Sequence, residues 1–268
     1  MILSVLINHG LTPQEIFFYR FLIAYIGIWA ISPKHLFADN LKDELWLVAG
    51  GVFGGSLYFF TENTALGITQ ASNVAFIICT APLLTTILSL LFYKSEKATK
   101  GLIYGSLLAL IGVGLVVFNG SVVLKLSPVG DLLTLLAALS WAFYSLVIKR
   151  MTGRYPTVFI TRKIFFYGVL TILPAFLLHP LQPDFDVLLQ PLVLSNLLFL
   201  AVLASLICYI LWNVVLKQLG TMRASNYIYL NPLVTMVASV LILHEQITWI
   251  TLMGAACIIL GVYLAEKK

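Results

Sequence analysis

Nine apolar runs alternate with short polar connections along the chain. A helix of about 17–25 residues crosses a bilayer, and each run has that length. The runs are Gln14–Ile31, Leu45–Leu66, Ala71–Tyr93, Gly101–Phe118, Asp131–Ile148, Thr157–Leu178, Val193–Leu216, Ala224–Leu243 and Trp249–Ala265. They lack the alternation of outer-membrane strands. The pattern therefore predicts an all-α integral membrane protein.

The same pattern occurs twice. Asn63-Thr64-Ala65-Leu66 and Pro82 return 150 residues later as Asn213-Val214-Val215-Leu216 and Pro232. Other members of the repeat follow at offsets of 149 or 153: Ala71-Ser72-Asn73 with Ala224-Ser225-Asn226, Glu96 with Glu245, Gly105 with Gly254, and Gly112 with Gly261. A repeat in so apolar a chain is typical of secondary transporters. We expect one five-helix repeat over residues 1–120 and a second over 128–268.

The first apolar stretch, Met1–Ile7, is too short to span a membrane alone. Seven helical residues extend about 10 Å, against a hydrocarbon core of about 30 Å. Alignment of the repeats places Met1 opposite Tyr144, well inside its partner helix. We expect the first half of helix one to be missing, through a misplaced start codon or a shortened chain. A protein with nine and a half helices is the alternative.

Composition agrees with a membrane location: 60% of the residues are hydrophobic, 10% are charged, and the mean hydropathy is +1.00. A soluble domain carries about 25% charged residues. The net charge is +5. Most of the basic residues lie between the apolar runs, so they indicate the orientation in the membrane rather than nucleic-acid binding. Alternating the segments puts 12 Lys and Arg on the side of the C-terminus and Lys125 alone on the other. This predicts an inner-membrane protein with a cytoplasmic C-terminus and, with five helices per repeat, an inverted second repeat.

At these residues the chain resembles the EamA type of the drug/metabolite transporter superfamily. The resemblance rests on Tyr58–Pro82 with Glu96, Tyr209–Pro232 with Glu245, and the helix from Gly130-Asp131 to Trp141. It implies ten helices in two inverted bundles. It also implies a central cavity lined by helices one to four and six to nine, with helices five and ten at the periphery. The implied activity is carrier-mediated movement of small metabolites, often export.

Ionisable groups inside the apolar runs are the strongest candidates for a substrate or ion pathway, because each costs a few kcal/mol in hydrocarbon. Glu62 is the one acid well inside a run, and Tyr58 lies one turn before it on the same face. Glu62 either contacts substrate or carries a coupling proton, or it is a hydrated carboxylate near the outer interface. Arg20 and the equivalent Arg162-Lys163 either snorkel to the interface or face the cavity, where Arg20 could pair with Glu62 or bind a substrate carboxylate.

Further candidates are polar or aromatic residues within the runs. Buried amides either join helices or contact a ligand, and large aromatic residues either pack or form a cavity wall. The candidates of these two kinds are Asn63, Asn73, Asn213, Asn226, Asn231, Trp141, Trp212 and Tyr209. Pro82 and Pro232 kink their helices and could act as gating bends.

The glycines of helices five and ten indicate close helix packing, with a homodimer interface as the alternative. The cysteines Cys79, Cys208 and Cys257 are isolated, and no spacing suggests a metal site. No nucleotide-binding loop or catalytic cluster is visible, so we expect neither a cofactor nor an enzyme.

The sequence thus predicts a secondary transporter that moves a small metabolite by alternating access. Its expected partners are the lipid bilayer, the small-molecule substrate and, as an option left open, a coupling proton. An amino acid or related compound leaving the cell fits the resemblance. A channel of the same topology is one alternative. A membrane enzyme or a sensory scaffold is the alternative from another class.

Overall fold

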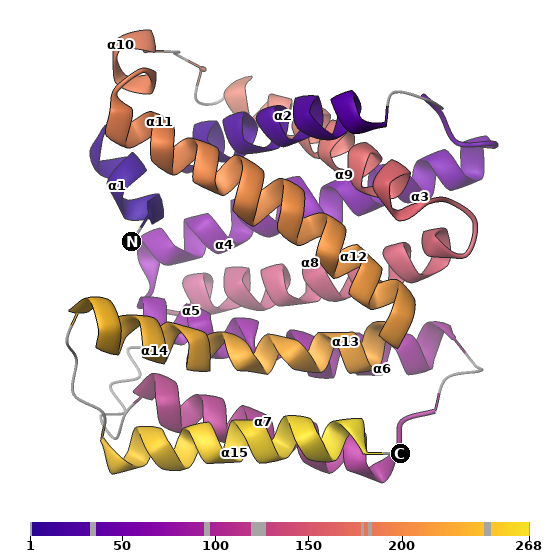
Figure 1. Cartoon of the computed structure of the whole chain (residues 1–268), viewed down its shortest axis with the longest axis vertical. Helices are drawn as coiled ribbons and strands as arrows, with labels where there is room; N and C mark the ends of the chain where they lie inside the picture. The colour runs from indigo at the N-terminus through magenta and orange to yellow at the C-terminus, as the bar shows by residue number, and fades with distance from the viewer. Residues whose placement is uncertain are drawn as a thin grey trace. The chain divides into compact units, whose positions relative to one another are not determined.

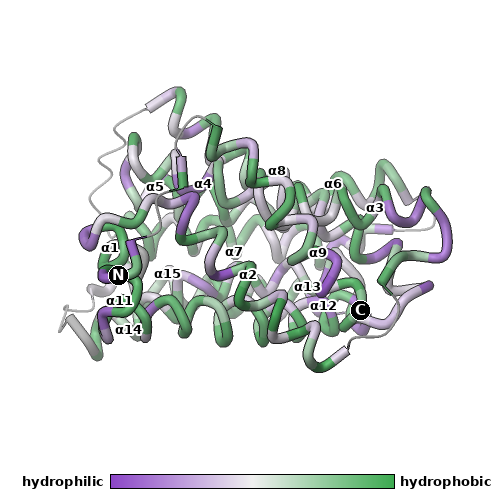
Figure 2. Tube along the Cα trace, turned by 90° about the horizontal axis from the view of Figure 1, so that it is seen from above, coloured by the Kyte–Doolittle hydropathy of each residue, from purple (hydrophilic) through white to green (hydrophobic). Residues whose placement is uncertain are grey.

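A computed structural model describes residues 2–32, 36–93, 97–118, 127–177, 180–181, 184–243 and 248–267. Glu96 and Glu245, two members of the repeat, lie outside these residues. Every regular element in the described residues is helical (Figure 1). Seven of the described helices are long and apolar enough to cross a membrane. Hydrophobic residues follow the helices, and most hydrophilic ones lie in turns and at helix ends (Figure 2), which agrees with the predicted all-α membrane fold.

The helices form two compact units. Unit 1 comprises residues 1–63 and 147–218, and unit 2 comprises residues 64–146 and 219–268. Each unit therefore draws on both predicted repeats: unit 1 takes residues 1–63 of the first and 147–218 of the second, and unit 2 takes the rest of each. The repeat is a division of the sequence, whereas the units are a division by packing.

Unit 1 contains α1 (Ile2–Asn8), α2 (Pro13–Ile31), α3 (Leu41–Gly51), η1 (Val52–Ser56), α9 (Thr157–Ile172), η2 (Leu173–Leu177), α10 (Phe185–Leu188), α11 (Pro191–Leu198), η3 (Phe199–Ile207) and most of α12 (Cys208–Leu219). Helices α4 (Leu57–Ile68) and α8 (Pro128–Thr152) contribute to both units. A capping box starts α2, since Thr12 accepts from the Glu15 amide and Glu15 accepts from the Thr12 amide. Pro13 follows at the first helical position, where no amide hydrogen is needed.

Two π-helical segments interrupt unit 1 at equivalent places in the two repeats. Shifted by 150 residues, η1 falls on residues 202–206, inside η3. A π-helical turn inserts an extra residue and redirects the side chains after it, and such turns are frequent at functional sites. The sequence repeat is therefore matched by a repeated local distortion.

Unit 2 contains α5 (Ala71–Ile78), α6 (Ala81–Phe92), α7 (Lys100–Phe118), α13 (Thr221–Asn226), η4 (Tyr227–Leu230), α14 (Asn231–Leu243) and α15 (Trp249–Glu266). The helix is interrupted before Pro82, between α5 and α6, and a 3-10 turn precedes Pro232. Proline lacks an amide hydrogen and disfavours a regular helix on its N-terminal side, which agrees with the loss of regular α-helix just before each proline.

Helices α7 and α15 lie side by side in unit 2 (Figure 1). A methyl group on Gly112 would lie 2.6 Å from the carbonyl oxygen of Gly254, and one on Gly261 would lie 2.6 Å from that of Gly105. The absence of side chains lets the two backbones touch. Close helix packing, the first of the two interpretations of these glycines, is confirmed. The glycine-bearing face of α7 packs against the glycine-bearing face of α15.

Candidate functional site

A half-buried arginine lies within the membrane-spanning helix α2. Arg20 donates from Nε to the Ser205 hydroxyl at 2.8 Å, and its guanidinium lies 4.7 Å from the centroid of the Phe59 ring. Ser205 has no exposed surface and belongs to η3. Three segments far apart in sequence therefore fix one cation, through a hydrogen bond and a cation–π contact.

The acid predicted to matter lies beside this cation. The Tyr58 hydroxyl donates to Glu62 Oε1 at 3.0 Å, as the spacing of one helical turn predicts. Tyr58 also packs edge-on against Phe59, with ring centroids 5.0 Å apart. The charges of Arg20 and Glu62 act on each other. We call Arg20, Tyr58, Phe59, Glu62 and Ser205 the Arg20 cluster.

An aromatic shell surrounds part of this cluster in unit 1. Tyr209 is buried, and its hydroxyl donates to the Gly54 carbonyl at 2.6 Å. Gly54 belongs to η1, where the irregular helix leaves a carbonyl available to an outside donor. Phe21 and Phe165 pack against the Tyr209 ring, with centroids 5.7 and 5.4 Å away. Tyr209 thus links η1 to α12, and its hydroxyl is directed at the backbone.

The buried asparagines join helices within their units. In unit 1, Asn213 donates to the Thr161 hydroxyl at 2.9 Å and connects α12 to α9. In unit 2, Asn226 accepts from the Ser106 hydroxyl at 2.9 Å and connects α13 to α7. Both asparagines have no exposed surface. These contacts match the helix-joining interpretation of Asn213 and Asn226.

The remaining predicted residues are divided between the units. Asn63 and Trp212 are half-buried in unit 1. In unit 2, Asn73 is buried, Trp141 is half-buried with its ring 5.1 Å from that of Tyr144, and Asn231 is exposed at the start of α14. The structure thus brings Arg20, Tyr58 and Glu62 together with Tyr209 nearby, and places Asn73, Trp141, Asn226, Asn231, Pro82 and Pro232 in the other unit.

Arg162 and Lys163, the counterparts of Arg20 in the repeat, have a different environment. Both are buried, with 2% and 3% of their surface exposed. Arg162 donates to the Ser32 carbonyl, and Lys163 donates to the Leu36 carbonyl at 3.0 Å and forms an ion pair with Glu44. Their polar groups are held by the segment between α2 and α3 and by Glu44 of α3.

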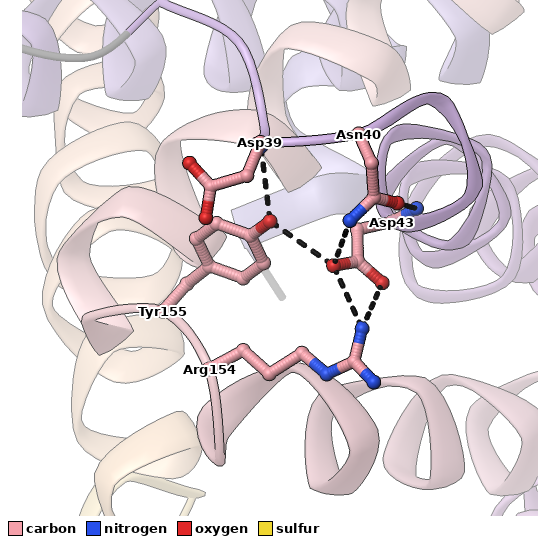
Figure 3. Close-up of polar contacts among 5 residues, drawn as sticks. All are labelled: Asp39, Asn40, Asp43, Arg154 and Tyr155. Carbon is pink, nitrogen blue, oxygen red and sulfur yellow. Dashed lines mark hydrogen bonds and ion pairs between the residues drawn. The ribbon is translucent and has the colours of Figure 1, made fainter.

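A second polar group fastens the start of α3 to the turn between α8 and α9 (Figure 3). Arg154 Nη1 donates to both carboxylate oxygens of Asp43 at 2.8 and 2.9 Å, and the Tyr155 hydroxyl donates to Oδ2 at 3.1 Å. Asn40 adds a bond of 3.0 Å, and the Asp39 amide donates to the Tyr155 hydroxyl at 3.0 Å. We call these five residues the Asp43 network.

The Asp43 network keeps its carboxylate ionised. Burial by itself would raise the pKa of Asp43, but the hydrogen bonds from Arg154, Asn40 and Tyr155 outweigh it and lower the pKa below the ordinary value of 3.8. Sequence reasoning missed this network, because residues 39–43 and residues 154–155 lie more than 100 residues apart and only folding brings them together.

A cavity of about 310 Å³ lies elsewhere in unit 1, lined by His9, Glu15, Tyr19, Asp184 and neighbouring residues of α2 and α10. Its two carboxylates already cap helices: Glu15 accepts from Thr12, and Asp184 accepts from the Asp186 and Val187 amides. Among the described residues, no three His, Cys, Asp or Glu side chains are placed to hold a metal ion.

Comparison with known proteins gives one family. The EamA-like transporter family matches residues 1–118 and 128–266. An uncharacterised transporter of Archaeoglobus fulgidus is 28% identical over 96% of this chain and 89% of its own length. A probable amino-acid metabolite efflux pump of Salmonella typhimurium is 26% identical over 96% of this chain and 86% of its own length.

A solved crystal structure shares the fold. It superposes with a TM-score of 0.77 at 17% sequence identity, covering 98% of this chain and 91% of the other. At this identity the likeness concerns the fold alone. Together with the family match, it agrees with the multi-pass membrane architecture predicted from the apolar runs.

Proposed function

Because the chain belongs to the EamA-like transporter family, we propose that this membrane transporter is a secondary carrier that moves a small metabolite by alternating access. The observation that carries the proposal is the Arg20 cluster. A cation and an acid within apolar helices are costly unless they face a partner, water or a ligand. Midplane charged groups on irregular helices are how many secondary carriers bind their substrates.

The charges of the cluster favour a substrate that carries both signs. Arg20 complements a carboxylate and Glu62 complements an amine, so their combination suits a zwitterion better than a strongly charged ion. The name of the Salmonella relative, a probable amino-acid metabolite efflux pump, points in the same direction. We therefore propose export of an amino acid or a related compound, with Tyr58, Phe59, Trp212 and Asn63 contributing to the site in unit 1.

Glu62 is our candidate for the coupling proton. It is the acid within the apolar part of unit 1 that shares a hydrogen bond with Tyr58 and feels the charge of Arg20. Glu62→Gln keeps the shape of the side chain and removes the titratable proton. We expect transport by this variant to lose its dependence on an imposed pH gradient. An unchanged rate and an unchanged pH dependence would remove Glu62 from the mechanism.

We also propose an inner-membrane location with ten helices in two inverted repeats, residues 1–120 and 128–268, and a cytoplasmic C-terminus. The 12-to-1 distribution of Lys and Arg supports this orientation. Reporter fusions test it. A fluorescent protein after Lys268 should fluoresce and alkaline phosphatase there should stay inactive; the opposite result refutes the orientation.

A homodimer, if it forms, needs other faces of α7 and α15 than the glycine faces, which are used within the chain. The outward residues Tyr104, Ile111, Met253 and Tyr263 are exposed and suit either lipid or a second copy. The mass of the protein in nanodiscs, measured by light scattering, distinguishes one copy from two.

The central test is counterflow in proteoliposomes. Vesicles are loaded with each of the common amino acids in turn, and uptake of the same labelled compound is measured. A carrier shows saturable uptake that is accelerated by the loaded substrate. A channel shows flux that rises linearly with concentration and no acceleration, and that result would exclude alternating access.

A further inference from the structure

The two π-helical segments of unit 1 each carry a buried serine, within one residue of the position that the repeat would make equivalent. Ser56 in η1 and Ser205 in η3 are 149 residues apart, one less than the 150 that relates Asn63 to Asn213, and they are 6% and 0% exposed. Their partners differ. The Ser56 hydroxyl lies 2.8 Å from the Thr171 hydroxyl, whereas the Ser205 hydroxyl accepts from Arg20 Nε at 2.8 Å. Two copies of one local structure thus have different chemical partners.

The bond to Ser205 determines which edge of the guanidinium remains available. Nε is used by Ser205, and one face of the guanidinium group lies over Phe59. Among the residues that the structure describes, no side chain or carbonyl accepts a hydrogen bond from Nη1 or Nη2 of Arg20. These two nitrogens present parallel N–H groups that fit the two oxygens of a carboxylate.

We propose that Ser205 is a positioning residue, which holds Arg20 by Nε so that Nη1 and Nη2 bind the carboxylate of the substrate. This inference rests on the proposed carrier function and deepens it, by assigning the part of the site that recognises the anionic group. A carboxylate is favoured over a phosphate because the nearby charge of Glu62 opposes a dianion. Ser56, with a hydroxyl partner, has no such role.

The first experiment observes Arg20 directly and needs no knowledge of the substrate. The protein is labelled with ¹⁵N-arginine in nanodiscs, and the Nε signal of Arg20 is assigned by its loss in Arg20→Lys. Sodium acetate is the carboxylate probe, and sodium chloride at equal ionic strength is the control. Acetate should shift the Arg20 signal in the wild type and in Ser56→Ala, and its apparent affinity should fall about tenfold in Ser205→Ala, the effect of one hydrogen bond to a charged group.

Two results would overturn the proposal. An Arg20 signal that acetate does not move in the wild type excludes carboxylate binding there. Equal acetate affinity in the wild type and Ser205→Ala excludes positioning by Ser205. If Ser205→Ala does not fold, Ser205→Cys replaces it, since it keeps the size but is a weak acceptor.

The second experiment uses transport. For the amino acid with the fastest counterflow, Ser205→Ala should raise KM about tenfold with kcat little changed, Ser205→Thr should restore KM, and Ser56→Ala should match the wild type. A loss of kcat at constant KM, or an equal effect of Ser56→Ala, indicates a merely structural role and refutes the proposal. If no amino acid is transported at all, the proposed function fails, and the acetate experiment still decides the inference.

Discussion

At the start of α3, the Asp43 carboxylate receives hydrogen bonds from the side chains of Arg154, Asn40 and Tyr155. Within the described residues, Glu62 in the Arg20 cluster receives one side-chain hydrogen bond, from Tyr58. The cations differ in the same way. Lys163 is buried against Glu44 and the Leu36 carbonyl, whereas Arg20 uses one of its nitrogens on Ser205. The first group of charges has several partners within the fold, and we propose that the second group binds the substrate.

The number of partners that a buried charge has within the fold suggests whether the charge serves stability or ligand binding. Charges that are fully paired within the fold stabilise a fixed arrangement, and removing one partner leaves the other buried and unpaired. Charges with unused hydrogen-bonding groups cost the protein free energy that a ligand can recover. The two clusters lie in the same compact unit, so mutations can compare them in one protein.

The largest expected effect on stability comes from breaking the Lys163–Glu44 ion pair. Lys163→Met leaves the Glu44 carboxylate, which is 14% exposed, without its cation. We expect the free energy of unfolding to fall by about 4 kcal/mol. The measurement is unfolding in detergent, followed by tryptophan fluorescence. Lys163→Met combined with Glu44→Leu should recover most of the loss. A double variant no more stable than the single one would show that the charges are not paired in solution.

The next effect concerns transport. Arg20→Gln removes a cation whose Nη atoms bind no described residue, so we expect counterflow to fall about 100-fold while the free energy of unfolding changes by less than about 1 kcal/mol. Both quantities are measured on the same preparation. A loss of stability comparable to that of Lys163→Met would place Arg20 with the structural charges instead.

The sequence predicted those parts of this comparison that depend on local spacing. Apolar runs marked the helices, and the four-residue spacing of Tyr58 and Glu62 predicted a shared helix face, which their hydrogen bond of 3.0 Å confirms. The cost of charge in an apolar run singled out Arg20. Each of these inferences needs only one helix and the physical properties of the membrane.

The unpredicted parts depend on tertiary packing. Ser205 is one serine in an apolar run, and nothing local marks it as the partner of an arginine 185 residues away. Arg162 and Lys163 occupy the repeat position of Arg20, yet they contact the segment between α2 and α3 and Glu44 of α3. The compact units combine both repeats, and a repeat in sequence does not reveal how helices are shared. These features depend on contacts between distant segments.

A smaller effect is expected from one chemical change made in both clusters. Tyr58→Phe and Tyr155→Phe each remove one hydroxyl that donates to a carboxylate, at 3.0 and 3.1 Å. Tyr58→Phe should raise the KM of transport about fivefold with little change in stability. Tyr155→Phe should lower the midpoint of thermal unfolding and leave KM unchanged. The comparison fails if the two variants change the same quantity.

The smallest effect is a pH dependence of stability that belongs to the Asp43 network. Because the pKa of Asp43 in the folded protein lies below 3.8, the unfolded chain binds its proton first as the pH falls. The stabilisation is therefore complete above the ordinary pKa and is lost as the pH falls through the folded value. Asp43→Asn lacks this dependence. The gap in thermal midpoint between wild type and Asp43→Asn should stay constant from about pH 7 to about pH 5 and narrow below it. Glu62 belongs to the other cluster, so Glu62→Gln should leave the narrowing of this difference in thermal midpoint unchanged. If the narrowing disappears in Glu62→Gln, the acid sensitivity belongs to the Arg20 cluster instead.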